Sequence, residues 1–215
     1  MAKARDKDSK VILAKLRKMH GEPRIELRYS NALELMVAAI LAAQCTDERV
    51  NKVTESLFKK YRAAREYLQV KDAELEDDIK STGFFRNKAR SIKNFAADVE
   101  QRFGGRVPED VETLTTIKGV GRKTANMVAG LAFGKPAIIV DTHVIRVSKR
   151  LGLTGHDDPE KIEMDLRKLV PEKTWTDFSL LVTLHGRYTC NARTPDCPRC
   201  LLQPECDFFK AGSRT

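Results

Sequence analysis

Four cysteines near the C-terminus have the spacing of a metal or cluster site. Cys190, Cys197, Cys200 and Cys206 follow the pattern C-x6-C-x2-C-x5-C within seventeen residues. Four thiolates this close together can hold an iron–sulfur cluster or a tetrahedral zinc ion. The common ferredoxin spacings differ from this one, so the cysteines alone leave zinc as an alternative. The fifth cysteine, Cys45, stands apart and is predicted to be a small buried side chain on a helix.

A second chemical signal lies about seventy residues upstream, where residues 117–124 read IKGVGRKT. The two glycines let the backbone turn tightly between two helices and approach a ligand closely. The N–H groups that open the second helix then form a phosphate site, which the helix dipole and nearby cations strengthen. Such contacts fix the register on DNA without reading its sequence. We therefore predict DNA contacts from Lys118, Gly119, Val120, Gly121 and Arg122.

Lys123 is the candidate nucleophile of this segment. It falls in the first turn of the second hairpin helix, where the helix end, the neighbouring Arg122 and partial burial would favour a neutral amine. A neutral lysine can attack an electrophilic sugar carbon, displace a base and form a Schiff base. The alternative is one more phosphate-binding lysine, and this segment by itself favours that alternative.

Asp141 is the candidate carboxylate for the same reaction. An aspartate near the lysine can relay its proton and stabilise the positive charge that develops on the sugar. Asp141 and Thr142 also form an N-cap signal for a helix that runs to about Leu151. Both roles can coexist, because capping would hold the carboxylate in place.

Helical periodicity dominates the rest of the chain, so we predict an all-α fold of about ten helices and no strand. Asn31 is expected to cap an apolar helix. A longer helix over 87–103 should end at a pair of glycines. Pro108 should open a short helix, and 122–133 should form the second hairpin helix. The apolar stretch 136–140 has no partner strand and is predicted to be a buried connector.

Charge and hydropathy narrow the class of protein. The 215 residues include 39 Lys and Arg against 30 Asp and Glu, which gives a net charge of +9. That excess favours a polyanionic partner, most commonly a nucleic acid, although a basic protein without such a partner is the alternative. The longest apolar run, 35–43, is too short to span a bilayer, and no apolar signal segment opens the chain. We predict a cytoplasmic location, associated with the nucleoid in a prokaryote, and no membrane contact.

Three stretches together resemble one family. They read GVGRKTAN over 119–126, VDTHV over 140–144 and HGRYTC over 185–190, and they look like endonuclease III, a family of bifunctional DNA glycosylases that remove oxidised pyrimidines. The resemblance runs from about residue 15 to 206. It implies that Lys123 is the Schiff-base nucleophile, that Asp141 is the catalytic carboxylate and that the four cysteines carry a [4Fe–4S] cluster rather than zinc.

The resemblance also implies an organisation. The expected fold is all-α and two-lobed, with a six-helix barrel lobe over 25–135 that contains the helix–hairpin–helix at about 112–133. The second lobe would combine 1–24 with 136–215 and carry the cluster loop, 190–206. The flipped base would lie in the cleft between the lobes.

A glycosylase must take its target base out of the stack, so side chains should fill the gap. Gln44 matches the family residue that enters the duplex, and Phe84 aligns with a wedge position where the family often has leucine. Phe84 or Phe85 could equally belong to the core. Lys118, Cys45 and Phe84 depart from the common family pattern, which leaves the lesion preference open. Further expected contacts to the lesion or to phosphates come from His143, Arg187, Arg193 and Arg199.

The expected partner is double-stranded DNA that contains damaged pyrimidines or abasic sites, bound by a monomer. Base release would precede β-elimination of the 3′ phosphate. One alternative is a monofunctional relative such as the adenine glycosylase of mismatches, but that branch needs an acid in the turn 40–43, which reads ILAA. The other alternative is a non-catalytic DNA-binding module, against which the pair of Lys123 and Asp141 argues.

Overall fold

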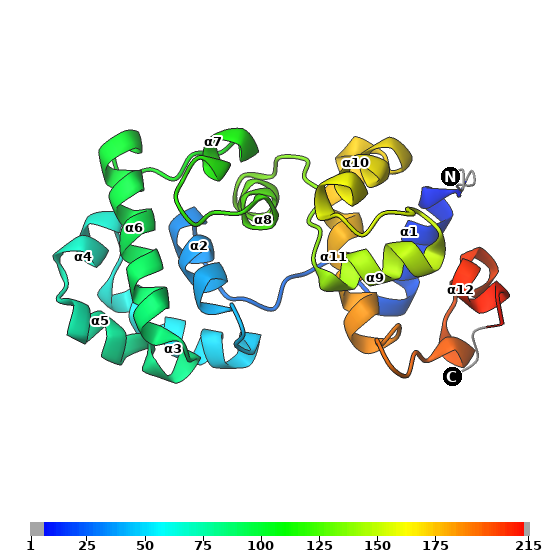
Figure 1. Ribbon diagram of the computed structural model, residues 1–215, viewed down its shortest axis with the longest axis horizontal. Coiled ribbons are helices and arrows are strands. Elements are labelled where there is room, and N and C mark those ends of the chain that lie inside the picture. Colours follow the sequence, from blue (N-terminus) through cyan, green and yellow to red (C-terminus); the bar gives the residue numbers. More distant parts are fainter. Residues whose placement is uncertain (1–6, 213–215) are drawn as a thin grey trace. The chain divides into compact units, whose positions relative to one another are not determined.

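The computed structural model describes residues 7–212, and throughout this range the chain is helical or irregular with no strand (Figure 1). The all-α prediction is therefore confirmed. Within the same range no helix is both long and apolar enough to cross a membrane. The helices are α1 (Ser9–His20), α2 (Ala32–Leu41), α3 (Asp47–Lys60), α4 (Ala64–Gln69), α5 (Asp72–Ile79), η1 (Lys80–Thr82), α6 (Phe85–Phe103), α7 (Val111–Thr115), α8 (Arg122–Phe133), α9 (Thr142–Leu151), α10 (Pro159–Leu169), η2 (Glu172–Thr174), α11 (Trp175–Tyr188), η3 (Cys197–Arg199), η4 (Gln203–Glu205) and α12 (Asp207–Lys210).

The chain divides into two compact units. The unit Ile25–Lys135, called the hairpin unit below, contains α2 to α8. The other, called the cysteine unit, combines the segment up to Arg24 with the segment from Pro136, so that α1 packs against α11 although the two are far apart in the sequence (Figure 1).

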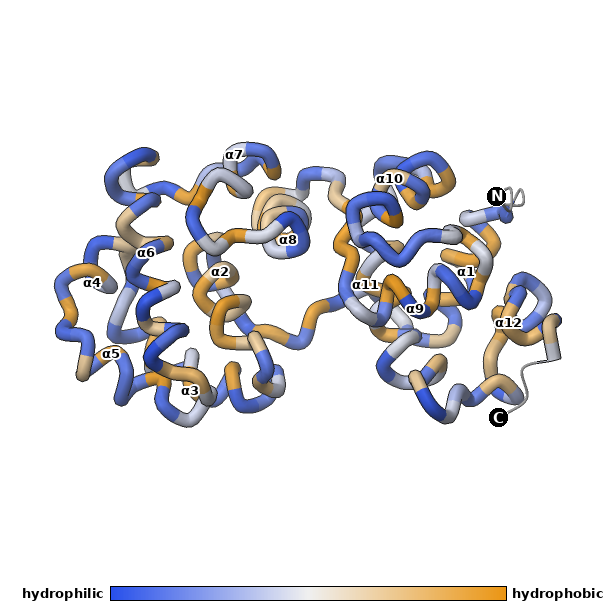
Figure 2. Tube along the Cα trace, viewed as in Figure 1, coloured by the Kyte–Doolittle hydropathy of each residue, from blue (hydrophilic) through white to orange (hydrophobic). Residues whose placement is uncertain are grey.

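Helix α2 lies at the centre of the hairpin unit. Its residues are apolar along nearly the whole length (Figure 2), and it packs against α3, α6 and α8. A helix that is apolar on all sides must be buried, which explains this position. Asn31 caps it as predicted, because its side-chain oxygen accepts a hydrogen bond from the Glu34 N–H at 2.9 Å.

Helix α6 is amphipathic and buries one face, including Ile92 and Phe95, against α2, α4 and α5. It ends at Gly104, which has a φ of +60°, as the sequence predicts. It begins at Phe85, earlier than expected. Helix α7 also differs from the expectation: Pro108 does not open it, because the Asp110 carboxylate caps it by accepting the Thr113 N–H at 2.8 Å.

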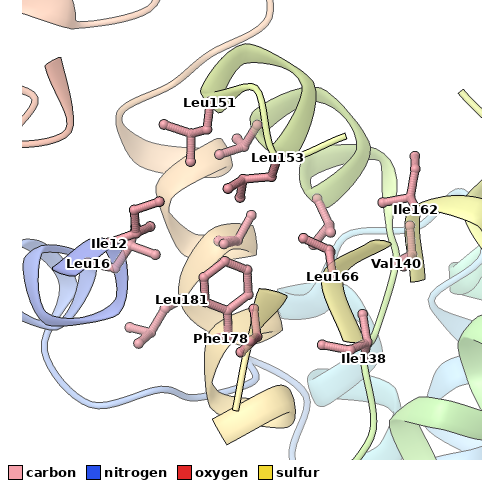
Figure 3. Close-up of a cluster of buried hydrophobic side chains, with 14 of the residues drawn as sticks. Ile12, Leu16, Ile138, Val140, Leu151, Leu153, Ile162, Leu166, Phe178 and Leu181 are labelled. Atoms are coloured by element: carbon pink, nitrogen blue, oxygen red, sulfur yellow. The ribbon is translucent and has the colours of Figure 1, made fainter. Parts of the chain in front are cut away.

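The core of the cysteine unit gathers around α11. Figure 3 shows apolar side chains from α1, α9, α10, α11 and the connector that precedes α9, among them Leu16, Leu166 and Phe178, all fully buried. Of the predicted connector 136–140, residues 137–140 are buried and irregular, whereas Pro136 is exposed. Its Ile139 N–H donates to Ser179 Oγ at 3.0 Å, which satisfies a buried backbone donor without a partner strand.

Candidate functional site

The turn between α7 and α8 leaves the start of α8 open. Gly119 has a φ of +88°, in the left-handed region that favours glycine, and the Val120 N–H closes the turn by donating to Ile117 O at 3.0 Å. Gly121 occupies the N-cap and has no side chain with which to cap the helix. The first N–H groups of α8 have no partner within the helix, and together with the helix dipole they form a potential anion site.

Lys118 and Gly119 are exposed in this turn, but the Val120 side chain is only 6% exposed. Val120 can therefore offer only its backbone to a ligand. Arg122 lies at the start of α8, and its Nη1 is 3.3 Å from Glu112 Oε1, an ion pair that connects the two helices of the hairpin.

Two residues of α6 hold the hairpin turn. Asp98 Oδ2 accepts the Lys118 N–H at 3.0 Å. Arg102 donates from Nη2 to Thr116 Oγ1 at 2.7 Å and from Nη1 to Thr116 O at 3.2 Å. Sequence reasoning missed both residues. Their spacing of one helical turn on α6 is compatible with a shared target, yet it does not name the turn that they contact.

Lys123 lies in the first turn of α8 and is exposed, so the expected partial burial is wrong. The physical reason is its place on the helix. Asn126, Met127 and Gly130, which lie further along the same side of α8, are buried, whereas Lys123 lies in the first turn, before the buried stretch 125–130 begins. Its amine is consequently accessible to a large ligand.

The hairpin unit has two strained turns. Gln44, after α2, and Phe84, before α6, have φ angles of +53° and +47°, and they are the only non-glycine residues in the described range with positive φ. Such strain persists only where the surroundings impose it, and it clusters at functional sites. Phe84 is 64% exposed and is therefore not a core residue. Both side chains line one hollow of about 340 Å³, together with Gly119 and Thr124 of the hairpin.

Asp141 is the N-cap of α9, as predicted, and both of its carboxylate oxygens are engaged. Oδ1 accepts the Val144 N–H at 2.7 Å, and Oδ2 accepts the Thr183 hydroxyl at 3.2 Å. The carboxylate is half-buried in the cysteine unit. Two hydrogen bonds from different helices fix its orientation. Sequence reasoning missed Thr183, which has no local signal.

His143 is the second residue of α9 and is half-buried. Burial, mainly, and the charges of Arg146 and Arg187 lower the pKa of its imidazole. Arg146 Nη2 is 3.1 Å from His143 Nδ1 and also donates to Gly186 O at 2.8 Å. Because a guanidinium only donates, Nδ1 accepts in this contact, which requires the tautomer that carries its proton on Nε2. Among the predicted phosphate contacts, Arg187 is half-buried and Arg193 exposed, whereas Arg199 is exposed but paired with Asp196.

The four cysteines of the loop line a single hollow, together with apolar side chains such as Leu151, Leu202 and Phe208. All four are half-buried free thiols. Burial raises the pKa of Cys200 to about 11, and it also raises the pKa of Cys197 and Cys206. Thiolates at this site therefore need a positively charged partner. In the part of the chain that the structure describes, no three His, Cys, Asp or Glu side chains are gathered closely enough to bind one metal ion.

Donors of hydrogen bonds surround these sulfurs. Arg150 Nη1 is 3.2 Å from Cys190 Sγ, the Leu202 N–H is 3.4 Å from Cys200 Sγ, and His185 Nε2 is 3.7 Å from the same sulfur. Arg150 also donates to Asn191 O at 2.7 Å. N–H donors and cations near the sulfurs suit a cluster held by thiolates. The residues present thus fit an iron–sulfur cluster, and Arg150 is a contributor that sequence reasoning missed.

Known proteins of the family that the sequence motifs resemble match this chain over most of its length. Residues 37–172 match the HhH-GPD superfamily of base excision DNA repair proteins. Endonuclease III of Synechocystis is 46% identical over 213 residues, which cover 99% of this chain and 97% of that protein. The chain belongs to the endonuclease III family. Endonuclease III of Bacillus subtilis is likewise 46% identical, over 90% of this chain and 89% of its own.

Two solved structures share the fold of this chain. A trapped endonuclease III–DNA covalent intermediate is 44% identical, with a TM-score of 0.90 over 100% of both chains. A thermostable thymine-DNA glycosylase is 25% identical, with a TM-score of 0.86 over 95% of this chain and 97% of its own. The predicted helix–hairpin–helix glycosylase fold is confirmed, and membership of the endonuclease III family favours neither the monofunctional nor the non-catalytic alternative.

A substitution at Gly186 tests the close packing of this residue against His143. A Cβ added at Gly186 would lie 2.6 Å from the His143 Cβ, so α9 and α11 would have to separate. We expect Gly186→Ala to lower the free energy of unfolding by about 1–3 kcal/mol, as over-packed sites do, measured by urea denaturation. Gly155→Ala is the matched control, because Gly155 is exposed with nothing within 4 Å of the added Cβ. Equal midpoints for the two variants would contradict the close contact.

Proposed function

We propose that this chain excises damaged pyrimidines from duplex DNA and cleaves the resulting abasic site through a Schiff base on Lys123. As a member of the endonuclease III family, it is a base-excision-repair DNA glycosylase with AP lyase activity. One observation supports the assignment of Lys123 as the nucleophile. Its side chain is exposed in the first turn of α8, a helix with no side-chain cap. The next residue, Thr124, lines the hollow that Gln44 and Phe84 also line.

The proposed reaction begins on the flipped nucleotide. The Lys123 amine attacks C1′ of the sugar, the C1′–N bond breaks, and the base leaves with its bonding electrons. Loss of a proton from the nitrogen and opening of the sugar ring give the Schiff base. Removal of a C2′ proton then expels the 3′ phosphate by β-elimination, which leaves a nicked strand.

Asp141 is proposed to act on the same nucleotide. Its carboxylate would receive or relay the proton of the Lys123 amine and stabilise positive charge on the sugar. The hydrogen bonds from Val144 and Thr183 support this role, because they hold the oxygens in a fixed orientation. His143, whose Nδ1 faces Arg146, would present its Nε2–H to the lesion or to a phosphate.

The DNA is proposed to dock through its backbone. The open N–H groups of α8, with Lys118, Gly119 and Arg122, would bind phosphates on one side of the lesion. Arg187 and Arg193 of the cysteine unit would add further phosphate contacts. Gln44 and Phe84 would enter the duplex and occupy the space of the flipped base. The chain would act as a monomer in the bacterial cytoplasm, at the nucleoid.

The four cysteines are proposed to hold a [4Fe–4S] cluster. The common hollow, the N–H donors and Arg150 support a group bound by thiolates, and membership of the endonuclease III family favours the cluster over zinc. When bound, the cluster would serve as a rigid cross-link of the loop 190–206. The loop could then present Arg193 at a constant position.

A borohydride trap tests the nucleophile. On a duplex with one thymine glycol, we expect a covalent protein–DNA band that Lys123→Ala abolishes, because no amine remains to form the Schiff base. Lys118→Ala is the control: its side chain is exposed in the same turn, so it should weaken DNA binding yet retain the band at saturating protein. A band of undiminished yield in Lys123→Ala would contradict the assignment.

Asp141→Asn tests the carboxylate with little change of shape. Asparagine still caps a helix, so the stability should change by less than about 1 kcal/mol. Base release in single turnovers should slow by about 10²–10⁴-fold, because the charge is lost. Asp158→Asn is matched, since Asp158 caps α10 by accepting the Lys161 N–H at 3.0 Å. Equal rates in the two variants would show that Asp141 is only a cap.

Metal analysis tests the cofactor. The purified chain should contain about four irons and four sulfides, with visible absorption typical of a cluster. Cys197→Ser should lower the iron content and make the loop sensitive to protease, whereas Cys45→Ser, outside the loop, should do neither. Stoichiometric zinc in place of iron would contradict the proposed cluster.

A further inference from the structure

Lys88 is a buried lysine that none of the steps above uses. Lys88 lies on α6 in the hairpin unit and is only 4% exposed. The ammonium donates to two backbone carbonyls, Leu41 O at 2.8 Å and Thr82 O at 2.7 Å. Lysine is almost never buried unless it is paired, and burial lowers the pKa of this one. The position therefore needs an explanation beyond packing.

The two carbonyls belong to the segments that lead into the two strained turns. Leu41 is the last residue of α2, three residues before Gln44. Thr82 is the last residue of η1, two residues before Phe84. The backbone N–H of Lys88 also donates to Phe84 O at 3.1 Å. Lys88 thus binds the backbone just before Gln44 and just before Phe84, the two residues that we propose to enter the duplex.

Two backbone hydrogen bonds close the turn around Gln44. Both are long, with Ala43 N at 3.4 Å from Ile40 O and Cys45 N at 3.2 Å from Ala42 O. A non-glycine residue in the left-handed region relaxes unless its surroundings fix it. The Lys88 ammonium supplies such a constraint. It also lies at the negative end of the α2 dipole, which favours its charged form.

We propose that Lys88 is a positioning residue that sets the spacing between Gln44 and Phe84, so that the two enter the duplex together. The inference rests on the proposed insertion of these two side chains. It predicts a defect in opening the duplex and none in the chemistry of an abasic site that is already accessible. A lysine that served only the fold would affect both equally.

The test compares Lys88→Met with Lys93→Met. Methionine keeps the length of the side chain and removes the donors. Lys93 lies on the same helix and its Nζ donates to Val70 O at 2.6 Å, but it does not line the hollow. Two assays are run: unstacking of a 2-aminopurine opposite thymine glycol in a duplex, followed by fluorescence, and cleavage of an abasic site in single-stranded DNA.

We expect Lys88→Met to slow unstacking by about tenfold or more, as misplacement of about 1 Å can do. Cleavage of the single-stranded abasic site should stay within about twofold of wild type. Lys93→Met should match wild type in both assays. If Lys88→Met does not fold, Lys88→Gln, which retains an N–H donor, takes its place and should show a smaller defect of the same kind.

Gln44→Ala and Phe84→Ala separate the two proposals. If neither slows unstacking, the insertion assignment itself is wrong. If both do while the Lys88 variant matches Lys93→Met, the positioning role is overturned and insertion stands. If the Lys88 variant lost unstacking and abasic-site cleavage equally, Lys88 would stabilise the fold only and would have no positioning role.

Discussion

The first N–H groups of α8 have no partner within the helix, and the residues around the hairpin turn keep this helix start uncapped. Gly121 cannot cap them, and the turn before it is short because Gly119 adopts a left-handed backbone. A capping side chain would satisfy the donors and close the site. The turn instead takes its support from α6, through Asp98 and Arg102, so the helix end stays open without losing its position.

The two units contribute different chemistry. The hairpin unit supplies backbone donors, an accessible amine and two side chains in strained turns. The cysteine unit supplies a carboxylate that two helices orient, and a loop whose thiols share one hollow with Arg150. In each unit the group that we propose to react lies at the start of a helix, where the chain leaves an irregular segment. The Lys123 side chain is exposed at its helix start, whereas the Asp141 carboxylate is half-buried and held by hydrogen bonds from two helices.

The sequence predicted what depends on neighbours along the chain. Asn31 and Asp141 cap their helices, Gly104 ends α6, and the hairpin glycine Gly119 takes the expected conformation, because each effect acts within a few residues. Two predictions failed: Pro108 does not open α7, which the nearby Asp110 caps, and Lys123 is not partly buried. Lys123 is exposed because it lies in the first turn of α8, whereas the helix is buried over 125–130, and how far a helix start projects from the core depends on the packing of the whole unit.

The same reasoning explains which site residues escaped notice. Arg150 binds the loop around Cys190 from 40 residues away, and Thr183 reaches Asp141 from 42 residues away. Lys88 contacts Leu41 across 47 residues. No periodicity or motif connects positions so far apart. The strain at Gln44 and Phe84 is hidden for a related reason, since neither residue type announces a left-handed backbone.

The placement of α1 beside α11 has a consequence for synthesis on the ribosome. Domains fold as units while the chain emerges, with N-terminal units first. Here α1 appears first but must wait for α11, with the whole of Ile25–Lys135 between them. The inserted unit can complete its core while α1 still has no partner. The cysteine unit therefore folds after the hairpin unit. Any cluster would be inserted at this late stage, when the hairpin unit is already folded.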